Sequence, residues 1–330
     1  MHQIAPDPPG SQRQRRCGMN RGRWLCFALA IALITLAWFQ IFSAHSGLVV
    51  RSLRRDSVPL LYLAPENAQG SAPGVLIAHG FAGSKQLMLG YGYVLAHQGY
   101  AVMLWDFDGH GSNSYPFSRQ DLQQNLQTAW DALKQQPEWD AKRLASLGHS
   151  LGSFATLSAA VQHPASFAAT VALSPVPAPV NARFPRNLQI QVGQWEPAQI
   201  QANGDRIMRE AGADSLIPSV DRSGDRGGGG VTRLLGRGQY QLTQVAKART
   251  ALADLEAALA EGLARQQIEI PKVEHIGILF SDRSHQAALD WLDRAFGLEV
   301  SGRGPRGSHV QLANLDRARS HWSWGNRIRG

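Results

Sequence analysis

Short apolar runs alternate along this chain with stretches in which apolar residues recur at helical spacing. The apolar runs predict strands at 74–78, 101–105, 143–147, 169–173, 188–192 and 268–270, after a first hairpin of residues 47–53 and 58–63. The helical spacing predicts helices at 86–98, 120–136 and 151–163, and a last one near Ser284 that ends at Gly297. This alternation predicts an α/β fold with a mostly parallel central sheet and helices on both faces.

A separate apolar segment precedes this pattern. Trp24–Phe42 is interrupted only by Thr35 and Gln40. A helix of that length, rising about 1.5 Å per residue, spans a hydrocarbon core of roughly 30 Å. An arginine cluster lies just before it, and positive charge stays on the cytoplasmic side. We therefore predict a single-pass transmembrane signal anchor at 24–43, with the N-terminus cytoplasmic and the following domain extracytoplasmic.

Two alternatives compete with the anchor. Ala44-His45-Ser46 resembles a signal-peptidase site, so that the segment would be a cleaved signal peptide. A buried helix of a soluble protein is the other alternative. The apolar run is longer than the roughly 7–15 residues of a signal-peptide core, which favours the anchor.

The formal net charge of +8 is concentrated at the two ends of the chain. Residues 1–23 carry a net +4 and residues 302–330 a net +5, so the body between them carries −1. A nucleic-acid-binding body would need a basic face of its own, so we expect no nucleic-acid partner. The composition of 1–23 and of the basic tail 301–330 predicts disorder. The two cysteines, Cys17 and Cys26, form no metal-ligand spacing.

One motif carries chemistry. Gly148-His149-Ser150-Leu151-Gly152 lies between a predicted strand and a predicted helix, the context that a G-x-S-x-G nucleophile elbow requires. The turn is sharp and the nucleophile lies in a strained backbone region, so its neighbours must be small. Ser150 is therefore the predicted nucleophile.

A serine alcohol needs a general base and a group that orients that base. His275 follows the last predicted strand and is the predicted base. Glu196 follows the strand 188–192 and is the predicted acid, with Asp205, Asp214 and Asp221 as rivals.

The developing oxyanion needs hydrogen-bond donors. The backbone N–H of Leu151 and that of Phe81, in the turn 79–84, are the predicted donors. The turn 106–112 holds Asp106, Asp108 and His110, which could ligate a metal, but a tight turn that shapes the pocket rim is favoured. We expect neither a metal nor a cofactor.

Residues 198–266 separate the last two predicted strands. They include the glycine run 227–230 and an alanine-rich helix at about 242–265. This insertion could be a lid over the pocket or a tolerated surface insertion, and the sequence leaves both open.

Five landmarks occur in order: H-G-F-A-G-S, D-F-D-G-H-G-S, G-H-S-L-G, G-Q-W-E-P and E-H-I-G-I-L-F. Together they resemble the α/β-hydrolase superfamily, in particular dienelactone hydrolases and serine-aminopeptidase-type esterases. The resemblance covers Val49–Gly297 and implies a hydrolase domain at 47–300 that cleaves esters, thioesters or amides through an acyl-serine, without a metal. The sequence departs from the pattern of this family in three places. The acid is Glu196 where aspartate is commoner. The usual cap site, between Leu173 and Leu188, is only a short connection, and the 198–266 insertion is longer than the fold requires.

The sequence as a whole therefore predicts a membrane-anchored serine hydrolase with peptidase activity also open. Its expected partners are a small acyl or ester substrate and, through residues 24–43, membrane lipid. A non-catalytic binding or scaffold protein on the same fold is one alternative. An acyltransferase with the same three side chains is the other.

Overall fold

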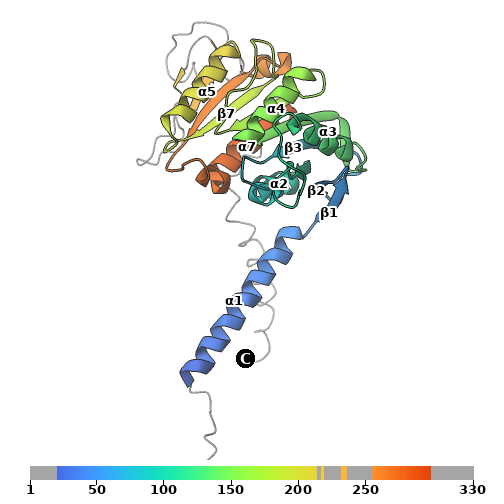
Figure 1. Cartoon of the computed structure of the whole chain (residues 1–330), viewed down its shortest axis with the longest axis vertical. Helices are drawn as coiled ribbons and strands as arrows, with labels where there is room; N and C mark the ends of the chain where they lie inside the picture. The colour runs from blue at the N-terminus through green and yellow to red at the C-terminus, as the bar shows by residue number, and fades with distance from the viewer. Residues whose placement is uncertain (1–20, 214–216, 219–231, 236–254, 299–330) are drawn as a thin grey trace, which may run out of the picture. The chain divides into compact units, whose positions relative to one another are not determined.

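The computed structural model describes residues 21–213, 217–218, 232–235 and 255–298. The predicted disordered segments therefore fall outside the described residues, except for the last residues of 1–23. The chain divides into two units, Met1–Ala44 and His45–Gly330, which are described separately (Figure 1).

The first unit contains one long helix. Helix α1 (Arg21–His45) includes the whole of the predicted anchor, and Gly22–His45 is long and apolar enough to cross a membrane. Apolar residues occur on every side of it, which is typical of a helix surrounded by lipid or by a protein core. A signal sequence near the N-terminus can also be long and apolar enough to meet this criterion.

The second unit is built on one sheet, which has ten strands within the described residues, in the order β1-β2-β4-β3-β5-β6-β7-β10-β9-β8. From β4 to β10 the pairing is parallel, while β1, β2, β9 and β8 pair antiparallel at the two edges. The strands are β1 (Leu48–Arg55), β2 (Val58–Pro65), β3 (Ala72–Ala78), β4 (Ala101–Trp105), β5 (Trp139–His149), β6 (Ala169–Leu173), β7 (Leu188–Gly193), β8 (Ile217–Pro218), β9 (Thr232–Leu235) and β10 (Arg265–Ile270).

Helices cover both faces of the sheet, as predicted (Figure 1). On β3, Val75 and Ile77 pack toward α2 (Leu89–His97) and α7 (Asp282–Ala295). Leu76 and Ala78 point the other way, toward α3 (Leu122–Leu133) and α4 (Leu151–Gln162). Helix α5 (Ala198–Glu210) covers β7 beside α4. Successive side chains of a strand point to opposite faces of the sheet, so each central strand contributes buried residues to the cores on both faces. The chain has the α/β-hydrolase fold.

Two predicted helices need correction. The helix predicted at 86–98 begins as a separate 3₁₀ turn, η1 (Lys85–Met88), before α2. The helix predicted at 242–265 is wrong at its end, because Arg265 opens β10. Residues 255–261 are helical, and 242–254 lie outside the described residues. Gly262, at φ +78°, ends the helix and allows the chain to enter the sheet beside β7.

The segment 198–266 therefore contains part of the crossover that the parallel pairing of β7 and β10 requires. It begins with α5 and ends inside β10. Whether its remaining residues form a lid stays a prediction.

Asn187, just before β7, links several elements. Its amide donates to the carbonyls of Ala168 and Leu259, both at 3.0 Å, and its side-chain oxygen accepts from the Ala264 N–H at 3.3 Å. Its own carbonyl accepts from the indole of Trp291 at 2.9 Å. The side chain is buried, so these carbonyls have little access to water.

Replacing Asn187 with alanine should lower the free energy of unfolding by about 2–4 kcal/mol, because buried backbone groups lose their partner and alanine is strained at φ 41°. Asn181→Ala is the control: it removes an asparagine whose side chain caps an exposed turn, and should cost about 1 kcal/mol or less. Urea denaturation measures both, and equal losses would contradict this role for Asn187.

Candidate active site

The predicted nucleophile lies in a tightly packed turn. Strand β5 ends at His149 and α4 begins at Leu151, with Ser150 between them at φ 51°, ψ −117°. A Cβ on Gly148 would lie 2.5 Å from the Thr156 hydroxyl, and one on Gly152 would lie 2.5 Å from the His79 carbonyl. Neither space admits a side chain, so both glycines are required by close backbone packing, as the motif predicts.

The structure brings the three predicted catalytic side chains together. The Ser150 Oγ lies 3.0 Å from His275 Nε2, and His275 Nδ1 lies 3.0 Å from Glu196 Oε2. Ser150 follows β5, Glu196 follows β7 and His275 follows β10. These strands are parallel, so their carboxyl ends meet at one edge of the sheet.

The turns that carry Glu196 and His275 are bound to each other. The Trp195 N–H donates to the Val273 carbonyl at 2.9 Å, and the Gln194 N–H donates to the Ile270 carbonyl at 2.8 Å. A Cβ on Gly193 would lie 2.5 Å from the Val273 oxygen, so this contact also requires glycine. The separation of the acid and the imidazole is therefore fixed by main-chain contacts.

The Glu196 carboxylate is buried and has two partners. Its Oε1 accepts from the Ser174 hydroxyl, and its Oε2 faces His275. Among the rival acids, Asp205 lies on α5 and accepts from the Gln267 amide at 2.8 Å. Asp214 and Asp221 lie outside the described residues. Within the described part of the chain, Glu196 is the carboxylate that contacts the imidazole.

Ser174 and Glu274 are site residues that the sequence analysis missed. The Glu274 carboxylate accepts from the N–H groups of Ile276 and Gly277, at 2.7 and 2.6 Å. It thereby satisfies two N–H groups at the start of η2 (Gly277–Phe280), the 3₁₀ turn that begins two residues after His275. An acidic residue just before a turn is the signal that the sequence offered. Ser174 gave no such signal, because its partner is distant in the chain.

His149 has a second role that the sequence did not reveal. Its Nε2 lies 2.8 Å from the His275 carbonyl oxygen, which can only accept, so this nitrogen carries the proton. Burial, with a smaller contribution from the neighbouring His275, lowers the pKa of His149 to about 4. His149 is therefore neutral near pH 7 and ties the end of β5 to the backbone of His275.

The predicted oxyanion donors lie beside Ser150. Phe81 follows β3 in a turn closed by the Gly83 N–H donating to the Gly80 carbonyl at 3.1 Å. Leu151 supplies the first N–H of α4. Within the part of the chain that the structure describes, neither amide donates to a protein acceptor. That these two amides bind a substrate oxygen stays a prediction.

Two buried contacts join that turn to the turn 106–112. His79 donates to the Gly80 carbonyl at 2.7 Å through Nδ1 and accepts from the Phe107 N–H at 3.1 Å through Nε2. Asp106 pairs with the Lys85 ammonium and accepts from the Lys85 and Ser112 N–H groups at 2.8 and 2.9 Å. Burial acts to raise the pKa of Asp106, but these hydrogen bonds outweigh it and hold the pKa below its usual value. The turn 106–112 thus shapes the site.

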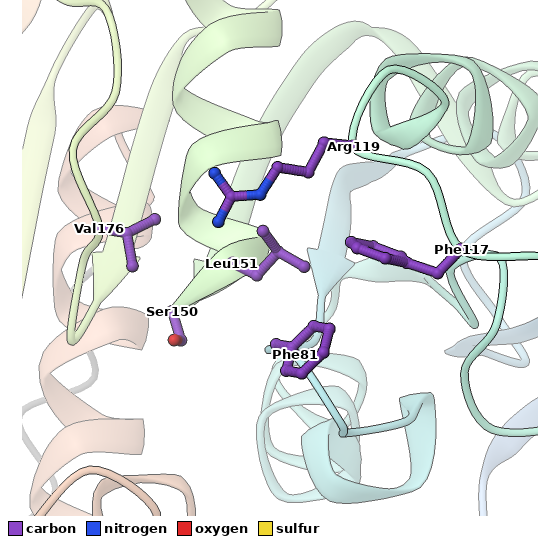
Figure 2. Close-up of a pocket in the computed structure, with 6 residues that line it drawn as sticks. All are labelled: Phe81, Phe117, Arg119, Ser150, Leu151 and Val176. Carbon is purple, nitrogen blue, oxygen red and sulfur yellow. The ribbon is translucent and has the colours of Figure 1, made fainter.

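A cavity of about 280 Å³ opens at Ser150 (Figure 2). Its lining residues are Phe81, Phe117, Arg119, Ser150, Leu151 and Val176. The rings of Phe81, Phe117 and His110 pack edge to face, with centroids 5.1–5.5 Å apart. Among the described residues, no group of three His, Cys, Asp or Glu side chains is placed to hold a metal. The site has the parts needed for acyl transfer to serine.

Comparison with known proteins gives matches to parts of the chain. Residues 71–205, less than half of it, match the family model of the serine aminopeptidases, S33. Two uncharacterized proteins of Mycobacterium tuberculosis, MT2364 (strain CDC 1551 / Oshkosh) and Rv2307c (strain ATCC 25618 / H37Rv), are 35% identical over 100 residues. The match covers 30% of this chain and 36% of theirs, so the chain spans about a third of the length of these relatives.

Solved structures are similar at lower identity. Esterase Est22 overlaps 51% of this chain and 70% of its own, with 17% identity and a TM-score of 0.42. A CIB-like hydrolase from Thermoplasma acidophilum overlaps 74% of this chain and 99% of its own, with 11% identity and a TM-score of 0.44. The family match and the fold support membership of the α/β-hydrolase superfamily.

The pKa of His149 predicts a pH dependence of stability. The folded protein holds this imidazole neutral down to about pH 4, whereas the unfolded chain protonates it near the ordinary value of 6.5. The unfolded state therefore binds more protons between these values, and the free energy of unfolding falls as the pH is lowered from about 6.5 to about 4. His79, whose pKa burial also lowers to about 4, acts in the same window.

His149→Gln should flatten part of this slope, because the amide keeps a donor but does not titrate. The matched control is His163→Gln, the same substitution at an exposed histidine, and His149→Gln should flatten the slope more than this control does. Urea denaturation at pH 4 to 8 measures both variants, and an unaltered slope in His149→Gln would contradict the neutral assignment.

Proposed function

We propose that this protein is a serine hydrolase that cleaves an ester, thioester or amide through an acyl-serine intermediate. The observation that carries the proposal is the chain of contacts from the Ser150 hydroxyl through His275 to Glu196, with 3.0 Å at each step. The match of residues 71–205 to the serine aminopeptidase family supports it.

The geometry supports the following reaction. As the Ser150 oxygen attacks the substrate carbonyl, its proton passes to His275 Nε2, and the Glu196 carboxylate stabilises the imidazolium through Nδ1–H. The imidazolium then protonates the leaving alcohol, thiol or amine as the bond to the acyl carbon breaks. In the second half, His275 takes a proton from water, the hydroxide portion attacks the acyl-serine, and the proton returns to the Ser150 oxygen.

The N–H groups of Phe81 and Leu151 would bind the negative oxygen of the tetrahedral intermediate. Losing one such donor in a serine hydrolase typically costs about 3 kcal/mol of transition-state stabilisation. The ion pair of Lys85 with Asp106 and the hydrogen bonds of His79 hold the Phe81 turn in place before substrate arrives. Preorganised donors need no rearrangement as the charge develops, which is what makes them effective.

We further propose that α1 anchors the enzyme in a membrane, with the N-terminus cytoplasmic and the catalytic unit on the other side. The length and apolar surface of Gly22–His45 support the anchor. The arginines of residues 1–23 support the orientation, since positive charge stays on the cytoplasmic side.

The catalytic proposal is tested with a fluorophosphonate probe and a panel of esters, lactones and peptide amides. The probe should label Ser150, identified by peptide mass spectrometry, and Ser150→Ala should abolish both labelling and turnover. Glu196→Gln should lower kcat by about 10⁴-fold, because an amide favours the wrong imidazole tautomer. The exposed Glu66 provides the matched control, Glu66→Gln, which should retain full activity.

Absence of labelling in folded wild-type protein would contradict the catalytic proposal and favour a non-catalytic role. An acyltransferase would label equally, but it would give mainly the transfer product when acceptor alcohols are added.

The anchor is tested by alkaline carbonate extraction of membranes and by the intact mass of the protein. The full chain should remain in the membrane pellet, with residues 1–44 still present. A soluble chain that begins near Gly47 would instead show cleavage after Ala44-His45-Ser46.

A further inference from the structure

The pocket contains one charged side chain, Arg119. The other lining residues are Ser150 and the apolar Phe81, Phe117, Leu151 and Val176. Figure 2 shows the guanidinium reaching from its loop toward Leu151 and Val176, across the pocket from the Phe81 ring. Among the described residues, no acidic side chain forms a salt bridge with it. Within the described part of the chain, Arg119 therefore places a cation at the cavity that no carboxylate pairs with.

The loop that carries Arg119 is fixed by aromatic packing. Phe117 lies against Phe81 and His110 with ring centroids 5.5 and 5.1 Å away. Its backbone also contacts Gly109, where a Cβ would lie 2.8 Å from the Phe117 Cβ. The chain two residues before Arg119 is therefore held by packing, and the exposed Arg119 side chain lines the pocket.

A guanidinium at the edge of an apolar cavity binds a carboxylate well. It presents two parallel N–H donors that match the two carboxylate oxygens. Arg119 is exposed, so a carboxylate paired with it would stay accessible to water. The cavity of about 280 Å³ is shared with the nucleophile, so one small molecule would contact both Ser150 and Arg119.

We propose that Arg119 selects substrates that carry a carboxylate. The carboxylate would lie on the part of the substrate, acyl or alcohol, that occupies this pocket beside the cleaved bond. This inference rests on the proposed hydrolase function and narrows its substrate to anionic esters, thioesters or amides. Arg119 is a specificity residue and takes no part in the proton transfers.

The test compares two matched pairs of esters. The first pair carries the charge on the acyl part: the mono-4-nitrophenyl ester of adipate and 4-nitrophenyl 6-methylheptanoate, in which an isopropyl group replaces the carboxylate. The second pair carries it on the alcohol part: 4-acetoxybenzoate and 4-acetoxybenzamide. Rates with Ser150→Ala are subtracted as the uncatalysed background.

Arg119→Gln should lower kcat/KM for the carboxylate member of at least one pair by about tenfold and change the neutral member by less than about twofold, as expected for a solvent-accessible charge-assisted pair. For the carboxylate ester, kcat/KM of Arg119→Lys should lie between the values of the wild type and of Arg119→Gln. Lysine keeps the charge but lacks the two parallel N–H donors of the guanidinium. The wild-type preference should shrink in 0.5 M salt. The control is Arg183→Gln, which removes an exposed arginine that precedes the amino-terminal end of β7. It should leave the preference for the carboxylate ester intact.

Equal loss on charged and neutral esters, or no loss in either pair, overturns the inference. In that case fluorophosphonate labelling of Ser150 and turnover of the neutral esters still support the hydrolase. If neither labelling nor turnover occurs, the proposed function fails and this inference fails with it.

Discussion

The close approach of two backbone segments at Ser150 is the constraint on which the site depends. The glycines on either side of Ser150 allow β5 to turn directly into α4, against the carbonyl oxygens at the end of β3. The turn holds Ser150 at positive φ, so its hydroxyl is presented at the sheet edge and the Leu151 N–H lies beside it. A strained residue of this kind persists only where the surrounding packing determines it.

The remaining site elements are connected to this turn. His149 precedes Ser150 and binds the backbone of His275, so the end of β5 also positions the proposed base. The β7 and β10 turns bind each other, which fixes Glu196 relative to His275. The same edge of the sheet receives the Phe81 turn, held by buried polar contacts to the turn after β4. The site is therefore preorganised by contacts between the turns that follow the parallel strands, some between backbone groups and some through buried side chains.

The sequence predicted the parts of this arrangement that follow from local pattern and strand order. The elbow has a local signature, and Glu196 and His275 could be proposed because the carboxyl ends of parallel strands share one edge. Ser174 could not be found, because its role depends on a partner brought near by the fold. The end of the helix predicted at 242–265 was wrong for a related reason: Arg265 joins β10 through pairing with β7, which local helix propensity does not register.

The central claim is that Ser150, His275 and Glu196 act together on an acyl group whose oxygen is bound by the Phe81 and Leu151 amides. A crystal structure of the protein after reaction with a small alkyl fluorophosphonate tests this directly. The account predicts a covalent bond from the Ser150 oxygen to phosphorus, the phosphonyl oxygen within about 3.1 Å of both amide nitrogens, and the His275 to Glu196 contact intact. Phosphorus on another residue, or a phosphonyl oxygen directed away from both amides, would contradict it.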